Sequence, residues 1–223
     1  MNKIDFMKEQ QLWEKFHKVG YNRFTLVGQP MDDLLKNYSI KNIDKALDVG
    51  CGGGFTTNYL KRYFTKVIFR RKDIKVYGID ISKTVIWKAQ KQYPDVVFKV
   101  CDGRNIPFDD NFFDFIFMHS VTVHIPRRFT KKYIKEFKRV LKPEGQALIQ
   151  LASFPSTSLD QLEDDPINYP AFGPEPHIGW PIEKIFDLVL NSGLVLESII
   201  RRYPKVDNPA IEEIKDYWVL LKK

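Results

Sequence analysis

The chain has 223 residues, of which 43% are hydrophobic and 28% are charged, so it is long enough for one α/β domain with a substantial core and short for two. No apolar run approaches the roughly 18 residues of a membrane span, and the N-terminal sequence lacks the apolar stretch of a secretory signal, so we expect a cytoplasmic protein without a membrane span. The formal net charge of +7 is concentrated in residues 61–75 and 127–142, and the rest of the chain is net acidic, so the charge alone does not indicate a nucleic-acid-binding protein.

Residues 1–42 are expected to form a helical cap on the domain. Leu12, Trp13 and Phe16 recur at helical spacing, which predicts a helix with one apolar face. Residues 28–30, with the sequence Gly-Gln-Pro, then predict a loop.

From residue 45 onward, predicted strands and helices alternate. The strands are expected at ALDV (46–49), VYGID (76–80), VVFKVCD (96–102), FDFIFMHS (113–120) and GQALIQLASF (145–154). Helices are expected at residues 55–64, 83–92 and 126–141, between these strands. The alternation predicts a doubly wound, mostly parallel sheet with helices on both faces. A further helix that ends near Gly193 precedes the strands LVLESIIRRY and DYWVLLKK, which predict a C-terminal antiparallel hairpin.

Residues 153–181 interrupt this regular pattern. They contain the prolines at positions 155, 166, 170, 174, 176 and 181, which exclude a long helix. Long irregular segments inside a compact domain are usually either functional or disordered. We therefore expect residues 1–223 to form a single domain in which residues 153–181 are a lid over the substrate.

The residues after the first strand form a glycine-rich turn. Asp48 is followed by Gly50, Gly52 and Gly54, and such a turn lets backbone N–H groups and a helix N-terminus approach a ligand closely. A dinucleotide-binding fingerprint needs a third glycine at position 55, which is Phe55 here. The turn also lacks the Lys-Ser/Thr pair of a Walker loop. The spacing therefore predicts neither an NAD site nor a nucleotide triphosphate site.

The sequence D-V-G-C-G-G-G at residues 48–54 resembles the D/E-x-G-x-G-x-G motif of class I, Rossmann-like methyltransferases that depend on S-adenosylmethionine (SAM). Asp80 ends the second strand, where this family places an acid that accepts the ribose hydroxyls, and Asp102 ends the third, where the family contacts the adenine amino group. The segment LKPEG at 141–145 resembles the family's L-K-P-G-G, with Glu144 as a departure.

The resemblance implies SAM as cofactor, S-adenosylhomocysteine as product, and a defined set of residues around the cofactor. Ile81 would pack on the adenine ring. The cofactor-binding residues that it implies are Asp48, Gly50, Cys51, Gly52, Gly54, Asp80, Ile81, Asp102, Gly103, Arg104 and His119.

Two other features lie close to these motifs. Cys51 and Cys101 have neither a disulfide nor a metal-ligand spacing, and we interpret both as reduced thiols that pack in the protein. With no dense acidic or histidine cluster, no metal site is expected. The segment from Gly50 to Asp80 is about ten residues longer than in the analogous dinucleotide-binding unit, and we interpret the excess at residues 66–75 as a surface extension.

Methyl transfer from a sulfonium is an in-line displacement that is accelerated mainly by alignment and desolvation, and it needs a base only for a poor nucleophile such as an alcohol. His119, after the fourth strand, and His177, in the lid, are the candidate bases, although each is more often a structural or surface histidine. Tyr169, His177 and Trp180 are expected to line the acceptor site, because no periodic core is predicted for them to join.

Three functions are consistent with the sequence. The first is O-methylation of a small polar metabolite, such as a sugar-linked or phosphorylated intermediate, because a proline-rich lid favours a capped site. The second is an RNA or protein methyltransferase that uses the basic segments, although these segments are expected on opposite faces of the sheet and more often form a solvated surface. The third is a protein that binds SAM without catalysis. The sequence gives no signal for an oligomeric state.

Overall fold

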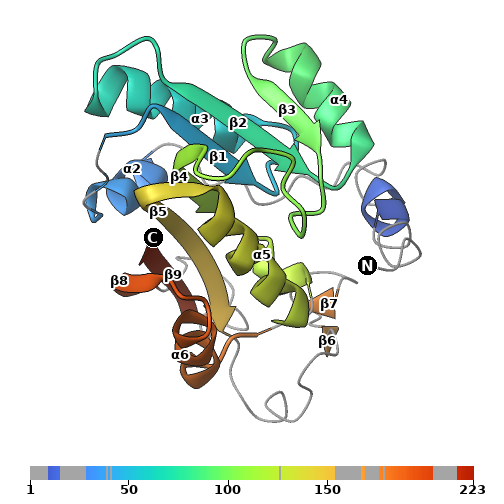
Figure 1. The fold of residues 1–223 in the computed structure, drawn as a ribbon. Helices are drawn as coiled ribbons and strands as arrows, with labels where there is room; N and C mark the ends of the chain where they lie inside the picture. The colour runs from blue at the N-terminus through green and yellow to red at the C-terminus, as the bar shows by residue number, and fades with distance from the viewer. Residues whose placement is uncertain are drawn as a thin grey trace.

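The computed structural model describes a seven-stranded sheet with helices packed against both faces (Figure 1). The described residues are 10–15, 29–38, 40, 42–125, 127–153, 167–168, 176–177, 179–202 and 215–223. The strands of the sheet are β1 (Lys45–Val49), β2 (Lys75–Asp80), β3 (Val97–Val100), β4 (Phe113–Met118), β5 (Leu141–Ser153), β8 (Val195–Arg202) and β9 (Lys215–Lys222). The helices and turns are α2 (Gln29–Lys36), α3 (Phe55–Arg62), the π-helical turn η1 (Tyr63–Ile68), α4 (Lys83–Gln92), the 3-10 turn η2 (Thr122–His124), α5 (Arg127–Val140) and α6 (Ile182–Leu190).

The strand order is β3-β2-β1-β4-β5-β9-β8. Strands β1 to β5 pair in parallel, and β9 pairs antiparallel with both β5 and β8, so the expected doubly wound sheet and C-terminal hairpin are confirmed. The chain order reverses between β1 and β4, which both emerge from the centre of the sheet. In open α/β sheets a ligand site forms at such a switch point, beyond the carboxyl ends of the strands.

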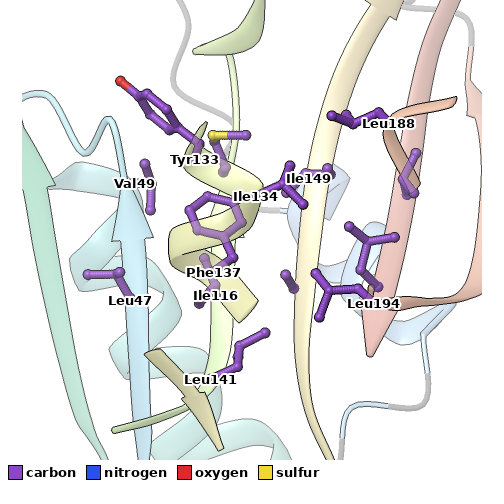
Figure 2. Packing of buried hydrophobic residues seen from close by; sticks show 14 of the residues in the cluster. Leu47, Val49, Ile116, Tyr133, Ile134, Phe137, Leu141, Ile149, Leu188 and Leu194 are labelled. Carbon is purple, nitrogen blue, oxygen red and sulfur yellow. The ribbon is translucent and has the colours of Figure 1, made fainter. Parts of the chain in front are cut away.

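One core lies between the sheet and helices α5 and α6. Ile134 and Phe137 of α5 lie on the strand residues Leu47, Val49 and Ile116 (Figure 2). Buried residues of α5 recur every three or four positions, so the helix buries one stripe and exposes the opposite one. β1 and β4 are buried on both faces, which explains why their sequences are almost continuously apolar.

A second core lies on the opposite face of the sheet, under α2 and α3. Leu34 of α2 and Leu60 of α3 are fully buried there, together with Ala46 of β1 and Phe115 of β4. The two faces are therefore covered by different helix pairs, α2 and α3 on one and α5 and α6 on the other.

The starts of α2 and β5 differ from the sequence expectations. α2 begins at Gln29, where a loop is expected, because a proline is compatible with the first turn of a helix, where its missing N–H leaves no bond unmade. β5 begins at Leu141, four residues before the expected start, and Glu144 adopts a left-handed φ of 65° within it. The Glu144 N–H donates to the carbonyl oxygen of Lys223 (3.1 Å), which ties this part of β5 to the end of the chain.

The extension at residues 66–75 lies on the surface. Val67 and Ile68 of η1 are exposed, and the Arg71 guanidinium pairs with both Asp44 and Asp73 at 2.7 Å. Within the described part of the chain, no helix combines the length and the hydropathy needed to cross a bilayer.

Candidate functional site

The glycine-rich turn between β1 and α3 folds back against the end of β2. The N–H groups of Gly50 and Cys51 both donate to the carbonyl oxygen of Ile79, at 2.8 and 3.0 Å. Gly50, Gly52 and Gly54 all adopt positive φ angles, of 72°, 50° and 82°. The turn therefore depends on glycine at these positions, since other residues rarely adopt this conformation.

The three glycines differ in what surrounds them. A Cβ atom at Gly50 would lie 2.2 Å from Cγ2 of Val121, and one at Gly54 would lie 2.8 Å from Cζ of Phe98. A Cβ at Gly52 would meet nothing within 4 Å. Gly50 and Gly54 thus permit close packing inside the protein, whereas Gly52 presents its backbone to open space where a ligand can approach.

Asp80 connects this turn to the residues after β2. One carboxylate oxygen accepts the N–H of Gly52 (3.0 Å), and the other accepts the N–H of Ser82 (2.9 Å). Ser82 in turn caps α4 by accepting from the N–H of Val85 (3.4 Å). Asp80 is only 9% exposed, and each of its oxygens has a second lone pair, so the carboxylate can still accept hydroxyl groups of a ligand.

Asp48 lies deeper, below the same turn. Its side chain is buried and accepts a hydrogen bond from the Thr57 hydroxyl (2.6 Å). Burial and the neighbouring Asp80 carboxylate raise the pKa of Asp48 to about 7, although the Thr57 hydrogen bond opposes this shift. A cation near this group would favour the charged carboxylate.

The turn after β3 holds Asp102 and Arg104 as a buried ion pair. Asp102 accepts the backbone N–H of Arg104 (2.9 Å), and its second oxygen accepts the Arg104 guanidinium Nε (2.9 Å) and a terminal nitrogen (2.8 Å). Gly103 between them has a φ of 76°, and a Cβ there would lie 2.2 Å from the Tyr133 ring. The turn is therefore fixed by its own residues and by α5, and the ion pair is a feature that the motif alone does not reveal.

The two cysteines are buried within this framework. Burial raises the pKa of the Cys51 thiol well above its ordinary value, and it raises the pKa of Cys101 to about 12. Cys101 bonds locally, since its sulfur accepts the N–H of Gly103 (3.2 Å). Both groups are thus protonated thiols with low reactivity. In the described residues, no group of three or more His, Cys, Asp or Glu side chains could hold a metal ion.

His119 follows β4 at the same edge of the sheet. Its ring stacks on Trp218 of β9, with centroids 5.5 Å apart and planes 8° apart, and Nε2 lies 3.2 Å from the Ser120 hydroxyl. Burial lowers the pKa of His119 to about 4, so the imidazole is neutral at physiological pH. The next residues are held by β5, since Gln150 accepts the Ser120 N–H (2.8 Å) and the Thr122 hydroxyl (2.9 Å).

The helical residues 10–15 contact both sides of this edge, which the sequence did not predict. Gln10 donates from Nε2 to the carbonyl oxygen of Ile81 (2.9 Å), and Glu14 accepts hydrogen bonds from Thr84. The Trp13 ring meets the His124 ring edge-on at 5.0 Å. Residues 10–15 therefore extend from the end of β2 to η2. Only the apolar spacing around Trp13 signalled a helix here, and nothing local indicated its partners.

The structure describes part of residues 153–181, the segment that is expected to form the lid. β6 (Ile167–Asn168) and β7 (Pro176–His177) form an antiparallel pair, and β7 lies against η2. The backbone of His177 is therefore near the site, while its side chain and all of Tyr169 fall outside the described residues.

The role of Trp180 at the acceptor site stays a prediction. Its side chain is 1% exposed in the core beneath α5 and α6, and the Arg127 guanidinium anchors this segment by binding the carbonyl oxygen of Gly179 (2.6 and 3.0 Å).

The site as a whole is a backbone cradle bordered by Asp48, Asp80 and Asp102. Its acceptors suit a ligand that carries positive charge, hydroxyl groups and an amino group. Of the cofactor-binding residues predicted from sequence, the structure brings together the glycine turn, Asp80, Ile81 and Asp102 with its neighbours around the ends of β1, β2 and β3. His119 lies at the end of β4, on the side where Trp218 and η2 are found.

Residues 47–149 match the sequence profile of a family described as "Methyltransferase domain". A demethylmenaquinone methyltransferase from Thermotoga maritima is 32% identical over 111 residues, which is 48% of this chain and 43% of that protein. A trans-aconitate 2-methyltransferase from Escherichia coli is 27% identical over 168 residues, which is 74% of this chain and 62% of that protein. The chain spans about half the length of the first of these curated relatives and somewhat more of the second.

Solved structures share the fold. A SAM-dependent methyltransferase from Methanosarcina mazei superimposes with a TM-score of 0.67 at 19% identity, covering 89% of this chain and 99% of that one. Geranyl diphosphate C-methyltransferase from Streptomyces coelicolor, solved with S-adenosylhomocysteine, has a TM-score of 0.64 at 15% identity, covering 86% and 79%.

Proposed function

We propose that this chain is a class I, Rossmann-like SAM-dependent methyltransferase that transfers the methyl group of SAM to a small-molecule acceptor. The similarity of residues 47–149 to the methyltransferase domain family supports this proposal. The observation that carries this proposal is the pairing of Gly52 with Asp80. Gly52 opens the turn toward a ligand, and Asp80 presents carboxylate oxygens directly beside that opening.

The described residues fit SAM. We propose that the Gly52 turn receives the methionyl part, that Asp80 accepts the ribose hydroxyls and that Asp102 accepts the adenine amino group. Ile81 is half-buried and contributes an apolar surface for the adenine ring. When bound, SAM supplies an electrophilic methyl group on a sulfonium. The buried carboxylate of Asp48 complements the positive charge of this cofactor, and a bound cation would keep Asp48 ionised.

We further propose that the acceptor atom is an oxygen on a small polar metabolite, such as a sugar-linked or phosphorylated intermediate. An oxygen that is already ionised fits best, because a histidine with a pKa of about 4 is a weak base at neutral pH. His119, which is held by stacking on the buried Trp218, would then orient the acceptor. For an ionised acceptor, alignment and exclusion of water supply most of the acceleration.

His177 remains the alternative base for a hydroxyl acceptor. The position of β7 against η2 brings its backbone toward the site, which supports a lid role for this part of residues 153–181. Because η2 also contacts Trp13 through His124, we propose that β7 and residues 10–15 enclose the acceptor from two sides.

An RNA or protein acceptor is the second candidate, and the two basic segments are the observation that favours it. They are on different faces of the sheet, since the segment at 61–75 begins in the last turn of α3 and most of the segment at 127–142 forms α5. A single groove lined by both segments is therefore not formed. Cofactor binding without catalysis is the third candidate, since the features of the cofactor site would serve it equally well.

Two measurements test these proposals. Calorimetry with S-adenosylhomocysteine tests the cofactor site, and binding in the low-micromolar range or tighter is expected. Mass spectrometry of small molecules that copurify with the protein, followed by assays of S-adenosylhomocysteine release with those molecules, tests the acceptor. Release with an RNA or protein but with no metabolite would overturn the small-molecule proposal, and tight cofactor binding without turnover on any acceptor would support the non-catalytic one.

A further inference from the structure

Basic side chains form an exposed stripe along the outer face of α5. Its members are Arg128, Lys131, Lys132, Lys135 and Lys138. They recur at three- and four-residue intervals, so they lie on the face opposite the buried residues Ile134 and Phe137. The one acid of α5, Glu136, lies beside the stripe and is paired with Arg139 at 2.7 Å.

The four lysines of this stripe are not neutralised by carboxylates of the described residues. Within the described part of the chain, Lys131, Lys132, Lys135 and Lys138 form no salt bridge, in contrast to Lys61, Arg71 and Arg139 elsewhere on the surface. Four lysines without a salt bridge on one helix produce a local positive potential that attracts an anionic surface.

Exposed apolar side chains adjoin the C-terminal end of the stripe. Leu190, at the end of α6, is 80% exposed, and Val195, at the start of β8, is 63% exposed. Between them lies Gly193, and a Cβ atom at Gly193 would be 2.3 Å from Nζ of Lys138. The last lysine of the stripe therefore reaches the turn that carries these two apolar residues, and α5 and α6 cover the same face of the sheet (Figure 1).

We propose that this surface, the α5 stripe together with Leu190 and Val195, docks on an anionic lipid bilayer. Cations are attracted to anionic headgroups, and apolar side chains gain free energy by entering the boundary between headgroups and acyl chains. A nucleic acid would use the cations but would leave Leu190 and Val195 without a partner. α6 contributes two acidic residues, Glu183 and Asp187, which are fewer than the five basic residues of the stripe, so the surface has a net positive charge.

The consequence concerns the site described above. α5 begins directly after η2, at the edge of the sheet where the candidate site lies. Docking through α5 would hold that edge near the membrane surface. The proposal does not rest on the proposed function, because the surface contains none of the residues assigned to the cofactor or the acceptor.

Cosedimentation with vesicles tests the proposal on the full chain. Vesicles of phosphatidylcholine with phosphatidylglycerol are compared with vesicles of phosphatidylcholine alone, and binding to the anionic vesicles only is expected. The triple variant K131Q/K132Q/K135Q should bind roughly 100-fold more weakly, since each basic residue near an anionic surface contributes about fivefold. The double variant L190S/V195S lacks the two apolar side chains, so its affinity for the anionic vesicles should fall about tenfold.

A matched control separates this surface from net charge. The triple variant R62Q/K66Q/K72Q removes the same charge from exposed positions on or beside the opposite face of the sheet, and its vesicle binding should stay within about threefold of the wild type. Binding of S-adenosylhomocysteine should be unchanged in every variant, which verifies folding and keeps this test independent of the proposed function.

An equal loss of vesicle binding in the two triple variants, or no binding of the wild type to anionic vesicles, would overturn the proposal. Binding to an oligouridylate that the K131Q/K132Q/K135Q variant loses, with no vesicle binding, would assign the stripe to nucleic acid instead.

Discussion

Replacing Asp80 by asparagine separates the structural role of its carboxylate from its role in cofactor binding. The substitution keeps the side-chain volume but turns one of the two acceptors into a donor, so either the Gly52 or the Ser82 N–H loses its partner. Hydrogen bonds to a charged group contribute about 1.5–3 kcal/mol each, and Asp80 is nearly buried, so the free energy of unfolding should fall by about this amount. If the same carboxylate accepts the ribose hydroxyls, the affinity for S-adenosylhomocysteine should also fall by about 10- to 100-fold.

Asp114 provides a matched control at the other end of the strands. One of its oxygens accepts the N–H groups of Asp44 (3.0 Å) and Lys45 (2.8 Å), and the other binds the Lys142 ammonium (2.6 Å), so asparagine keeps the backbone bonds but loses the charged partner of Lys142. Urea denaturation should show that Asp80→Asn and Asp114→Asn lower the free energy of unfolding comparably. Calorimetry with S-adenosylhomocysteine should show a loss of affinity in Asp80→Asn alone.

The reasoning would be refuted by an Asp80→Asn protein that has lost stability as expected but binds S-adenosylhomocysteine as tightly as the wild type. The carboxylate would then be only a link between the turns after β1 and β2. Equal losses of affinity in both variants would indicate a general loosening of the domain rather than a ribose contact.

Three further predictions follow from the same site. Gly52→Ala should weaken the binding of S-adenosylhomocysteine at least about tenfold in calorimetry and lower Tm only slightly. Gly54→Ala, which forces a Cβ against Phe98, should mainly lower Tm. The reverse pattern would contradict the assignment of Gly52 to the ligand. The pKa of Asp48 is raised from 3.8 to about 7, so the native state holds a proton that the unfolded state releases, and stability should fall as pH rises through this window. His119 has the opposite effect, because its pKa is lowered from 6.5 to about 4, so stability should fall as pH drops through that window. The Asp48→Asn variant removes the opposing contribution of Asp48, and its free energy of unfolding should rise from about pH 4 to 6.5. A flat profile would refute this. Finally, the pH–rate profile should show no inflection from His119 between about pH 6 and 8, and His119→Asn should keep more than about a tenth of kcat; a larger loss restored at high pH would make His119 a base.

The cofactor half of the site was predictable from sequence because its determinants are local. Each residue follows a strand directly, and parallel strands bring their carboxyl ends to one edge, so Gly52, Asp80 and Asp102 converge once the strand pattern is recognised. The glycine spacing also carries its own physical reason, because the turn needs three positive φ angles. What the motif could not reveal is that Arg104 already occupies part of the Asp102 carboxylate.

Trp180 shows why the structure of residues 153–181 was harder to predict from sequence. It lies near the end of residues 153–181, a stretch with six prolines and no periodicity, so no sequence pattern indicates a core position for it. Its burial depends on a contact between the Gly179 carbonyl and Arg127, which are 52 residues apart. Reasoning from periodicity detects a side chain that shares a helix or strand face with others, and it does not detect one that is positioned by hydrogen bonds to a distant residue.

The acceptor half of the site follows the same logic as Trp180 and not that of the glycine turn. Trp13 meets His124, Gln150 holds the backbone of Ser120, and Trp218 stacks on His119, so each of these contacts around the proposed acceptor site joins segments that are far apart in the sequence. Such contacts can change one at a time without disturbing the strand ends that hold the cofactor. A local motif is therefore enough to predict the cofactor, whereas the proposed acceptor site depends on long-range packing around η2 and β9. Within the proposal, the neutral, stacked His119 is the part of that packing that most restricts the chemistry of the acceptor.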